Sequence, residues 1–598
     1  MSSKPKEYNY FLYVALAVIS AAAVLYFEPY RLPVHHDVAG SINDAGLFLR
    51  SKEVVQNFGG PIVPLEHLLY GLPHVVSGVT GIPVIEAYRI LLLVGLEFMA
   101  LLACLTFPKP CNTNKWRHVF FSILIFSAIF FLPFNFMYRH LFGTREHLIV
   151  AFILPYFALL FRRLDGGDVG KLHAIFVGLF AAIGFSLKPL YALVFIFSEL
   201  VFIVLVRKRS AMLRPEALLC SALGLLYLCF WLMFFPKYFS QTGVMYSAIA
   251  GSFKDPAAIL GAARTDLMLV IIVVLSGIVL YINDDQRLKG PRLKQGLLFI
   301  AAALSCALIT YIQRRWFVHH RFPTHVFALL LLVTSWPLLQ PMLIASLLCS
   351  ALIAYWLGYL PNQVNDILML LAAEPWQTML IARLIVGALL LSLVYKVCLA
   401  SYRSVLVDFF SKLFSTSWIA LRPLLIAIAL AYPLLSYLKG YQKLSRQQMV
   451  IRRGINSFET DISGQTVGLL SSHLRPYHTL FLEKGAHWHF PWRNMSYLDS
   501  VYVEQDKPKN SVIYLPPSKY PPQLKAAHDV LISFLKTSPP RFLIVDHSMR
   551  IVLNFIRLDY IKALEMDPRF EPVWSRYHLV ERKNPKRGLK FDVFELGQ

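Results

Sequence analysis

The stretch PVHHDVAGSINDAG, which begins at Pro33, gathers residues that could do chemistry directly after an apolar run. His35, His36 and Asp37 stand side by side, and Asp44 follows seven residues later. A carboxylate beside a hydroxyl suits a general base, whereas imidazoles with a carboxylate also suit a metal. If the stretch is helical, the aspartates lie about two turns, or roughly 10 Å, apart, so only one could reach a reacting carbon. Asp37 is the first candidate base and Asp44 the second.

Three further segments place cations where apolar runs break. They are YRHLFGTREHL with Arg145, Glu146 and His147, GFSLKPLY with Lys188, and QRRWFVHHRFPTH with Arg314, Arg315, His320 and Arg321. Ionisable groups near membrane depth are costly and usually mark a substrate path or a satisfied internal pair. Guanidinium forks and ammonium groups suit a phosphate or pyrophosphate. These segments therefore predict a phosphate site.

Each of these residues also has a structural explanation. Arg145 and Glu146 could form an ion pair that holds two helices, and Lys188 could extend to lipid headgroups. The cluster at 313–325 could bind ordinary anionic lipid, and the two aspartates could be helix caps. The functional hypothesis rests on the combination of an acidic segment and three cationic segments, which together suit a lipid-phosphate-linked donor.

The elements that must position these residues are membrane spans. The chain has 598 residues, of which 57% are hydrophobic and 16% charged, whereas soluble domains are about 25% charged. Apolar runs of about 18–20 residues are long enough to cross a bilayer as helices. They predict about 13 helices, within 10–27, 84–107, 118–137, 148–161, 173–187, 190–206, 217–235, 266–283, 295–312, 324–339, 342–360, 381–400 and 419–437. The chain is thus predicted to be a polytopic α-helical membrane protein.

Basic residues in short loops predict the orientation. With the N-terminus in the cytoplasm, every proposed inner loop is basic, and an odd number of spans places the C-terminal part outside. The basic residues that give the net charge of +23 are explained by this orientation in the membrane, and we find no nucleic-acid-binding motif. The seven cysteines lie in or beside apolar runs and show no CxxC spacing.

The last part of the chain, 439–598, is polar and mixed in charge. TVGLL, SVIYLPP and RFLIVDH read as short buried strands, and PPQLKAAHDVLISFLK has helical periodicity. We therefore expect two domains, namely a transmembrane domain over 1–438 with an external first loop at 28–83, and a small extracytoplasmic α/β domain over 439–598.

Several stretches resemble the GT-C superfamily of integral membrane glycosyltransferases, and in particular bacterial members that use a polyprenyl-phosphate sugar. They are HHDV at 35–38, GGPIVPLEHLLYGLP at 59–73, REHL at 145–148, LKP at 187–189, QRRWFVHHRFP at 313–323 and HLRPYHTLFLEKGAHWHFPW at 473–492. The resemblance spans most of the chain through short motifs. It differs at one point, since the superfamily usually has paired acids in the first loop, where this chain has one acid flanked by histidines.

The resemblance implies transfer of a sugar from a polyprenyl-phosphate donor to a glycan, lipid or protein acceptor at the outer face of a bacterial inner membrane. Asp37 would be the base and attack would invert the anomeric carbon. The donor phosphate would contact the phosphate-site cations named above, namely Arg145, Lys188, Arg314, Arg315, His320 and Arg321. His35, His36, Glu146 and His147 would have supporting roles. We expect no metal or other cofactor, with a divalent metal at the histidines as the alternative.

Other classes of function remain open from the sequence. A flippase or transporter of lipid-linked glycans would also need charges at membrane depth. Paired broken helices in matching halves of the chain would favour this class of function over a transferase. A polymerase or ligase of surface polysaccharide would share the lipid-linked donor. A scaffold without activity is the last alternative.

Overall fold

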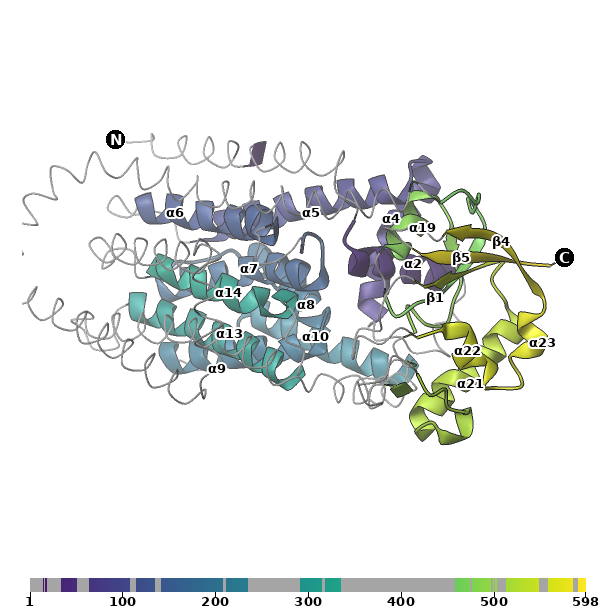
Figure 1. Ribbon diagram of the computed structural model, residues 1–598. Helices are drawn as coiled ribbons and strands as arrows, with labels where there is room; N and C mark the ends of the chain where they lie inside the picture. Colours follow the sequence, from purple (N-terminus) through teal and green to yellow (C-terminus); the bar gives the residue numbers. More distant parts are fainter. Residues whose placement is uncertain are drawn as a thin grey trace, which may run out of the picture. The chain divides into compact units, whose positions relative to one another are not determined.

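The computed structural model (Figure 1) describes residues 14, 17–18, 34–50, 64–107, 115–134, 141–207, 211–234, 291–313, 318–334, 456, 458–473, 476–495, 498, 501–502, 512–547, 558–583 and 590–597. All these residues belong to one compact unit, made of Met1–Thr334 and Pro433–Gln598. The second unit, Ser335–Tyr432, is not among the described residues. The predicted spans within 266–283, 342–360, 381–400 and 419–437, most of the span within 10–27, and the domain boundary at 438/439 also lie outside the described residues.

The first part of the unit is helical. Its helices are α2 (His36–Arg50), α4 (Pro64–Thr80), α5 (Val84–Thr106), α6 (Lys115–Phe126), η1 (Ser127–Phe131), η2 (Leu132–Phe134), α7 (Arg145–Leu164), α8 (Lys171–Ser186), η3 (Pro189–Tyr191), α9 (Ala192–Val206), α10 (Pro215–Phe234), α13 (Pro291–Gln313) and α14 (Val318–Thr334). Among the residues that the structure describes, five segments are long and apolar enough to cross a membrane, namely Val84–Thr106, Arg145–Leu164, Pro189–Val206, Pro215–Phe234 and Leu293–Gln313. The prediction of a helical membrane protein is confirmed, while the total of about 13 spans stays a prediction.

The helix break at Lys188-Pro189 is confirmed and has a local cause. The ring of a proline disfavours the helical conformation of the residue before it. Lys188 accordingly has φ −146° and ψ 107°, so α8 ends at Ser186 and η3 leads into α9. Because of the break, Lys188 lies between α8 and η3 and not within a helix, at the point where its side chain meets other charged residues.

The described part of the predicted external loop at 28–83 contains the helices α2 and α4, which pack against each other. Apolar residues of α2, such as Val38, Ile42 and Ala45, are buried. This helix also packs against a helix and a strand of the C-terminal domain (Figure 1). The stretch that carries Asp37 and Asp44 is therefore held from two sides.

The C-terminal part is an α/β domain, as predicted. Its elements are β1 (Thr466–Leu470), α19 (Tyr477–Glu483), β2 (His487–Trp488), η5 (Pro517–Lys519), α21 (Pro522–Thr537), β3 (Phe542–Asp546), α22 (Tyr560–Glu565), α23 (Glu571–Trp574), β4 (Tyr577–Lys583) and β5 (Phe591–Leu596). The strand order is β2-β1-β3-β5-β4, with β1 parallel to β2 and β3, and β5 antiparallel to β3 and β4.

Two of the three predicted strands and the predicted helix of this domain are confirmed, as β1, β3 and α21. The strand predicted in SVIYLPP is wrong, because residues 512–516 have no regular structure and η5 follows. Proline cannot donate to a strand ladder, and this segment ends in Pro516-Pro517. The amide of Leu515 instead donates to the Tyr502 hydroxyl at 3.4 Å.

Candidate functional site

Asp37 lies in the first turn of α2, where the unsatisfied amide groups of a helix favour a negative charge. Its carboxylate is 3.6 Å from Nδ1 of His35 and 3.9 Å from Nε2 of His36, and its side chain is 39% exposed. A ring nitrogen of His35, a ring nitrogen of His36 and a carboxylate oxygen of Asp37 all lie within 4.8 Å of one another. The group could accept a proton from a ligand or hold a cation.

Asp44 shares the helix with Asp37 but has a different environment. Nε of Arg493, from the α/β domain, donates to its carboxylate at 2.7 Å, and both side chains are largely buried. Burial raises the pKa of the Asp44 carboxyl, and Arg493 opposes that rise. Because Asp44 is engaged in this ion pair, it is poorly suited to taking a proton from a substrate.

The absence of a side chain at Gly40 allows Arg493 to lie across α2. A Cβ at Gly40 would be 2.9 Å from Cδ of Arg493, so this close approach requires glycine. Nη2 of the same arginine donates to the Ser41 hydroxyl at 3.4 Å. A second link follows along α2, where Nδ2 of Asn43 donates to the carbonyl of His478 at 3.0 Å. Arg493 and His478 thus fix the helix that carries Asp37 to the α/β domain.

Arg145 begins α7 and forms an ion pair with Glu66 of α4. Nη1 of Arg145 donates to the Glu66 carboxylate at 2.7 Å, and the Ser41 hydroxyl donates to the same carboxylate at 2.9 Å. Glu66 is buried. The partner of Arg145 in this pair is Glu66, and not Glu146 as the structural alternative supposed, and the pair joins α7 to α4 and, through Ser41, to α2.

A glycine turn sets the position of Arg145. Gly143 has a φ of 75°, in the left-handed region that favours glycine, and its amide donates to Nδ1 of His147 at 2.9 Å. Its carbonyl accepts a hydrogen bond from the Tyr70 hydroxyl at 2.7 Å. His147, which we predicted to support the site, is buried and also bonds to the carbonyl of Ile129 at 2.8 Å. These contacts give His147 a role in the shape of the turn.

Lys188, Glu146 and His320 form a second charged group. Nζ of Lys188 is 3.0 Å from the Glu146 carboxylate and 3.1 Å from Nδ1 of His320, which is itself 2.9 Å from Glu146. All three are buried and come from α7, the break before η3, and α14. Three segments that are distant in the sequence therefore meet, as the hypothesis of one phosphate site requires.

The two groups are joined at the first turn of α7, because Arg145 and Glu146 are consecutive residues of it. We define the charge cluster as Asp37, Glu66, Arg145, Glu146, Lys188 and His320. Arg321 is also buried, one residue after His320, whereas Arg314 and Arg315 lie outside the described residues. Within the described part of the chain, Asp37 forms an ion pair with no arginine or lysine, whereas Glu66 and Glu146 each contact a cation.

Reasoning from the sequence missed Glu66, Arg493 and His478. Glu66 stands in an apolar stretch that was noted for its resemblance, and an acid in such surroundings is a signal that could have identified it. Arg493 directly follows the stretch noted at 473–492. Its partner lies 449 residues away in the sequence, a separation that no local pattern reveals.

Comparison with known proteins gives one structural similarity. No family model matches the chain, and no curated protein matches it. The crystal structure of ArnT from Cupriavidus metallidurans bound to undecaprenyl phosphate is similar to it, with a TM-score of 0.48 and 10% sequence identity over 98% of this chain and 97% of that chain. At this degree of similarity, the function has to be argued from the side chains of this chain.

Proposed function

We propose that the protein is a membrane glycosyltransferase that moves a sugar from a polyprenyl-phosphate donor to a hydroxyl of a glycan, lipid or protein acceptor. The observation that carries the proposal is the charge cluster, in which the partly exposed carboxylate of Asp37 stands on the helix that Ser41 joins to the ion pair of Glu66 and Arg145. A catalytic base needs a lone pair that is not already engaged, and among the acids of α2, α4 and α7 Asp37 meets this need best.

In the proposed reaction, the acceptor hydroxyl attacks the anomeric carbon while the carboxylate of Asp37 takes its proton. The bond between that carbon and the phosphate oxygen breaks, and the polyprenyl phosphate leaves with the electron pair. The leaving group is a stable anion, so no strong acid has to protonate it. A direct attack on a donor held in one pose inverts the anomeric centre.

The cations of the cluster would hold and neutralise the phosphate. Arg145 offers a planar fork and Lys188 a point charge, and a carboxylate holds each of them in place. Fixed charges that need no rearrangement are commonly the largest catalytic contribution. His35 and His36 lie beside Asp37, where they can contact an acceptor.

The proposal places the reaction at the outer face of a bacterial inner membrane. It rests there on the basic loops assigned to the cytoplasm and on the contact between α2 and the α/β domain. A reporter fused after Lys439 tests this orientation. A cytoplasmic signal there would contradict the assignment of the charge cluster to the outer face.

Binding of undecaprenyl phosphate tests the phosphate site. The Arg145→Ala variant should bind this probe more weakly by about 1.5–3 kcal/mol, the range for a lost hydrogen bond to a charged group. Arg89→Ala is the matched control, because Arg89 also forms a 2.7 Å ion pair, with Glu86, and is 13% exposed compared with 19% for Arg145. Equal affinity of both variants would overturn the role of Arg145. Arg315→Ala is expected to act as Arg145→Ala does.

Transfer of labelled sugars from polyprenyl-phosphate donors tests the base. The Asp37→Asn variant should lose about 10²–10⁴-fold in turnover while it still binds undecaprenyl phosphate. Asp44→Asn should lose less, because that carboxylate is committed to Arg493. Near-normal turnover of Asp37→Asn together with an inactive Asp44→Asn would reverse the roles, and activity in both would make α2 a structural element only.

A further inference from the structure

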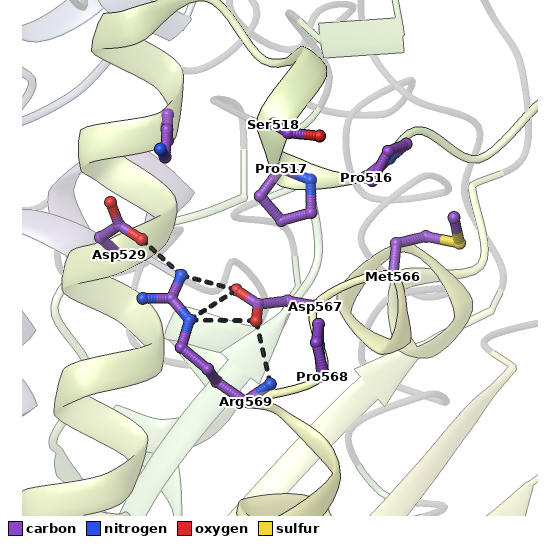
Figure 2. Close-up of a pocket in the computed structure, with 9 residues that line it drawn as sticks. Pro516, Pro517, Ser518, Asp529, Met566, Asp567, Pro568 and Arg569 are labelled. Carbon is purple, nitrogen blue, oxygen red and sulfur yellow. Dashed lines mark hydrogen bonds and ion pairs between the residues drawn. The ribbon is translucent and has the colours of Figure 1, made fainter.

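The α/β domain has a pocket that is separate from the charge cluster and that the proposed reaction does not use (Figure 2). Its volume is about 380 Å³, and it is lined by η5 and the residue before it, by α21 and by the turn after α22. Pro516, Pro517 and Pro568 supply apolar surfaces, and Lys525, Asp529 and Arg569 supply charged groups.

A chain of polar contacts runs from the interior to this pocket. Nε2 of His528, which is fully buried, lies 3.1 Å from the carboxylate of Asp567. Asp567 accepts hydrogen bonds from the amide and from two guanidinium nitrogens of Arg569, at 2.7–3.1 Å. The same guanidinium donates to Asp529 at 2.5 Å (Figure 2). Burial alone would raise the pKa of Asp567, but the hydrogen bonds from Arg569 hold it below its usual value.

These polar contacts fix two side chains at the mouth of the pocket, Arg569 and Asp529. Arg569 is 54% exposed and Asp529 is 40% exposed, although both are held in one geometry. Within the part of the chain that the structure describes, Nη1 of Arg569 and one oxygen of Asp529 have no partner. Polar groups that are already ordered reduce the entropic cost of binding a ligand.

The balance of charge indicates which ligand suits the pocket. Lys525 lies one turn before Asp529 on α21, so the lining has two cations and two carboxylates. Such a lining has no excess charge to attract an inorganic anion. A hydroxyl donates and accepts at once, so neighbouring hydroxyls can bond to Asp529 and Arg569 together. The proline rings and Met566 line the same pocket and offer an apolar surface that suits the apolar side of a sugar ring.

We propose that this pocket binds a neutral oligosaccharide. That the bound glycan is the acceptor of the reaction rests on the proposed function. The site then supplies specificity away from the reacting atoms, because it recognises a part of the acceptor that takes no part in bond making.

The test measures binding of neutral trisaccharides of hexose and N-acetylhexosamine units to the full-length protein by saturation-transfer NMR. Lipid nanodiscs are used, because detergents with sugar headgroups would compete. We expect at least one trisaccharide to bind, and Arg569→Gln and Asp529→Ala to weaken it about tenfold or more. Arg541→Gln is the matched control, since Arg541 is 53% exposed and pairs with Glu595 of the same domain outside the pocket.

The Lys525→Met variant shows whether weaker trisaccharide binding comes from loss of the site and not from loss of folding. Lys525 is exposed, and among the described residues it has no ion-pair partner, so this change should weaken trisaccharide binding without affecting the fold. Wild-type affinity in both Lys525→Met and Asp529→Ala would overturn the proposal, as would the absence of trisaccharide binding to the wild type. Competition by inorganic phosphate would overturn the preference for a neutral ligand.

Undecaprenyl phosphate binding, measured on the same samples, separates this inference from the proposed function. If no trisaccharide binds but the lipid phosphate does, the inference alone fails. If trisaccharides bind as expected and the lipid phosphate does not, the proposed function fails and the oligosaccharide site stands.

Discussion

Replacing Arg493 by glutamine should loosen the attachment of α2 to the α/β domain and destabilise the protein. Nε of Arg493 is 2.7 Å from the Asp44 carboxylate, and the two side chains are 15% and 16% exposed. The glutamine would leave that carboxylate buried without a counter-charge. The helix would also lose the weaker contact from Arg493 to Ser41.

The expected magnitude follows from this geometry. Removing one partner of a fully buried ion pair costs about 3–5 kcal/mol. Because water still reaches about a sixth of each side chain, we reduce the expected loss to about 2–3 kcal/mol for Arg493→Gln. Asp44→Asn should cost less, since the long arginine side chain can turn towards solvent. The double variant should be more stable than the sum of the single losses predicts, by about 1.5–3 kcal/mol.

The assay is thermal unfolding in nanodiscs, followed by tryptophan fluorescence at a fixed scan rate. A loss of 1 kcal/mol lowers Tm by about 2–4 °C in a domain of 150–250 residues, so Arg493→Gln should lower it by about 4–12 °C. The control cycle is Arg541→Gln with Glu595→Gln, an exposed pair whose coupling should be about 0–1 kcal/mol. Equal coupling in the two cycles would refute the reasoning that Arg493 anchors α2.

Three further predictions concern the same region. Burial raises the pKa of Asp44 above 3.8, so protonation of Asp44 favours folding, and this contribution to stability is lost as pH rises through the pKa of the folded state. Arg493→Gln should therefore lower Tm less at acidic than at neutral pH. In an Asp44→Asn background this difference between the two pH values should disappear. Gly143→Ala should lower Tm and weaken undecaprenyl phosphate binding, because a Cβ there would be 1.8 Å from the Tyr88 hydroxyl at a φ of 75°; an unchanged Tm would contradict the account of the turn. Glu66→Gln should tighten undecaprenyl phosphate binding by removing the carboxylate that neutralises the arginine at the start of α7; weaker binding would mean that the pair only holds helices together.

Features that depend on local sequence could be predicted well. The apolar runs indicated helices, and the Lys188-Pro189 pair indicated a break whose cause is confined to two residues. Cations at the ends of apolar runs indicated a common cluster, because a charge at membrane depth needs a partner. The structure does bring Lys188, Glu146 and His320 together.

Features that depend on distant contacts could not be predicted in this way. Nothing around Arg493 indicates that its partner is Asp44, and nothing around Glu66 indicates Arg145. Strands β4 and β5 were missed, since their hydrogen bonds are made across the sheet and strand propensity depends on the neighbours. The same dependence explains the incorrect strand in SVIYLPP, where a tyrosine hydroxyl takes the place of a strand partner.

The balance of charge within the cluster separates the roles of its cations. Arg145 and Lys188 each contact a carboxylate, so these pairs together have no excess charge to attract a phosphate from a distance. They can orient the phosphate at close range, where the direction of a hydrogen bond matters more than net charge. On the proposed function, we expect the charge that attracts the phosphate to come from the segment at 314–321, which holds three arginines and no acid. We therefore propose that Arg145 and Lys188 orient a bound donor, whereas Arg314, Arg315 and Arg321 attract it.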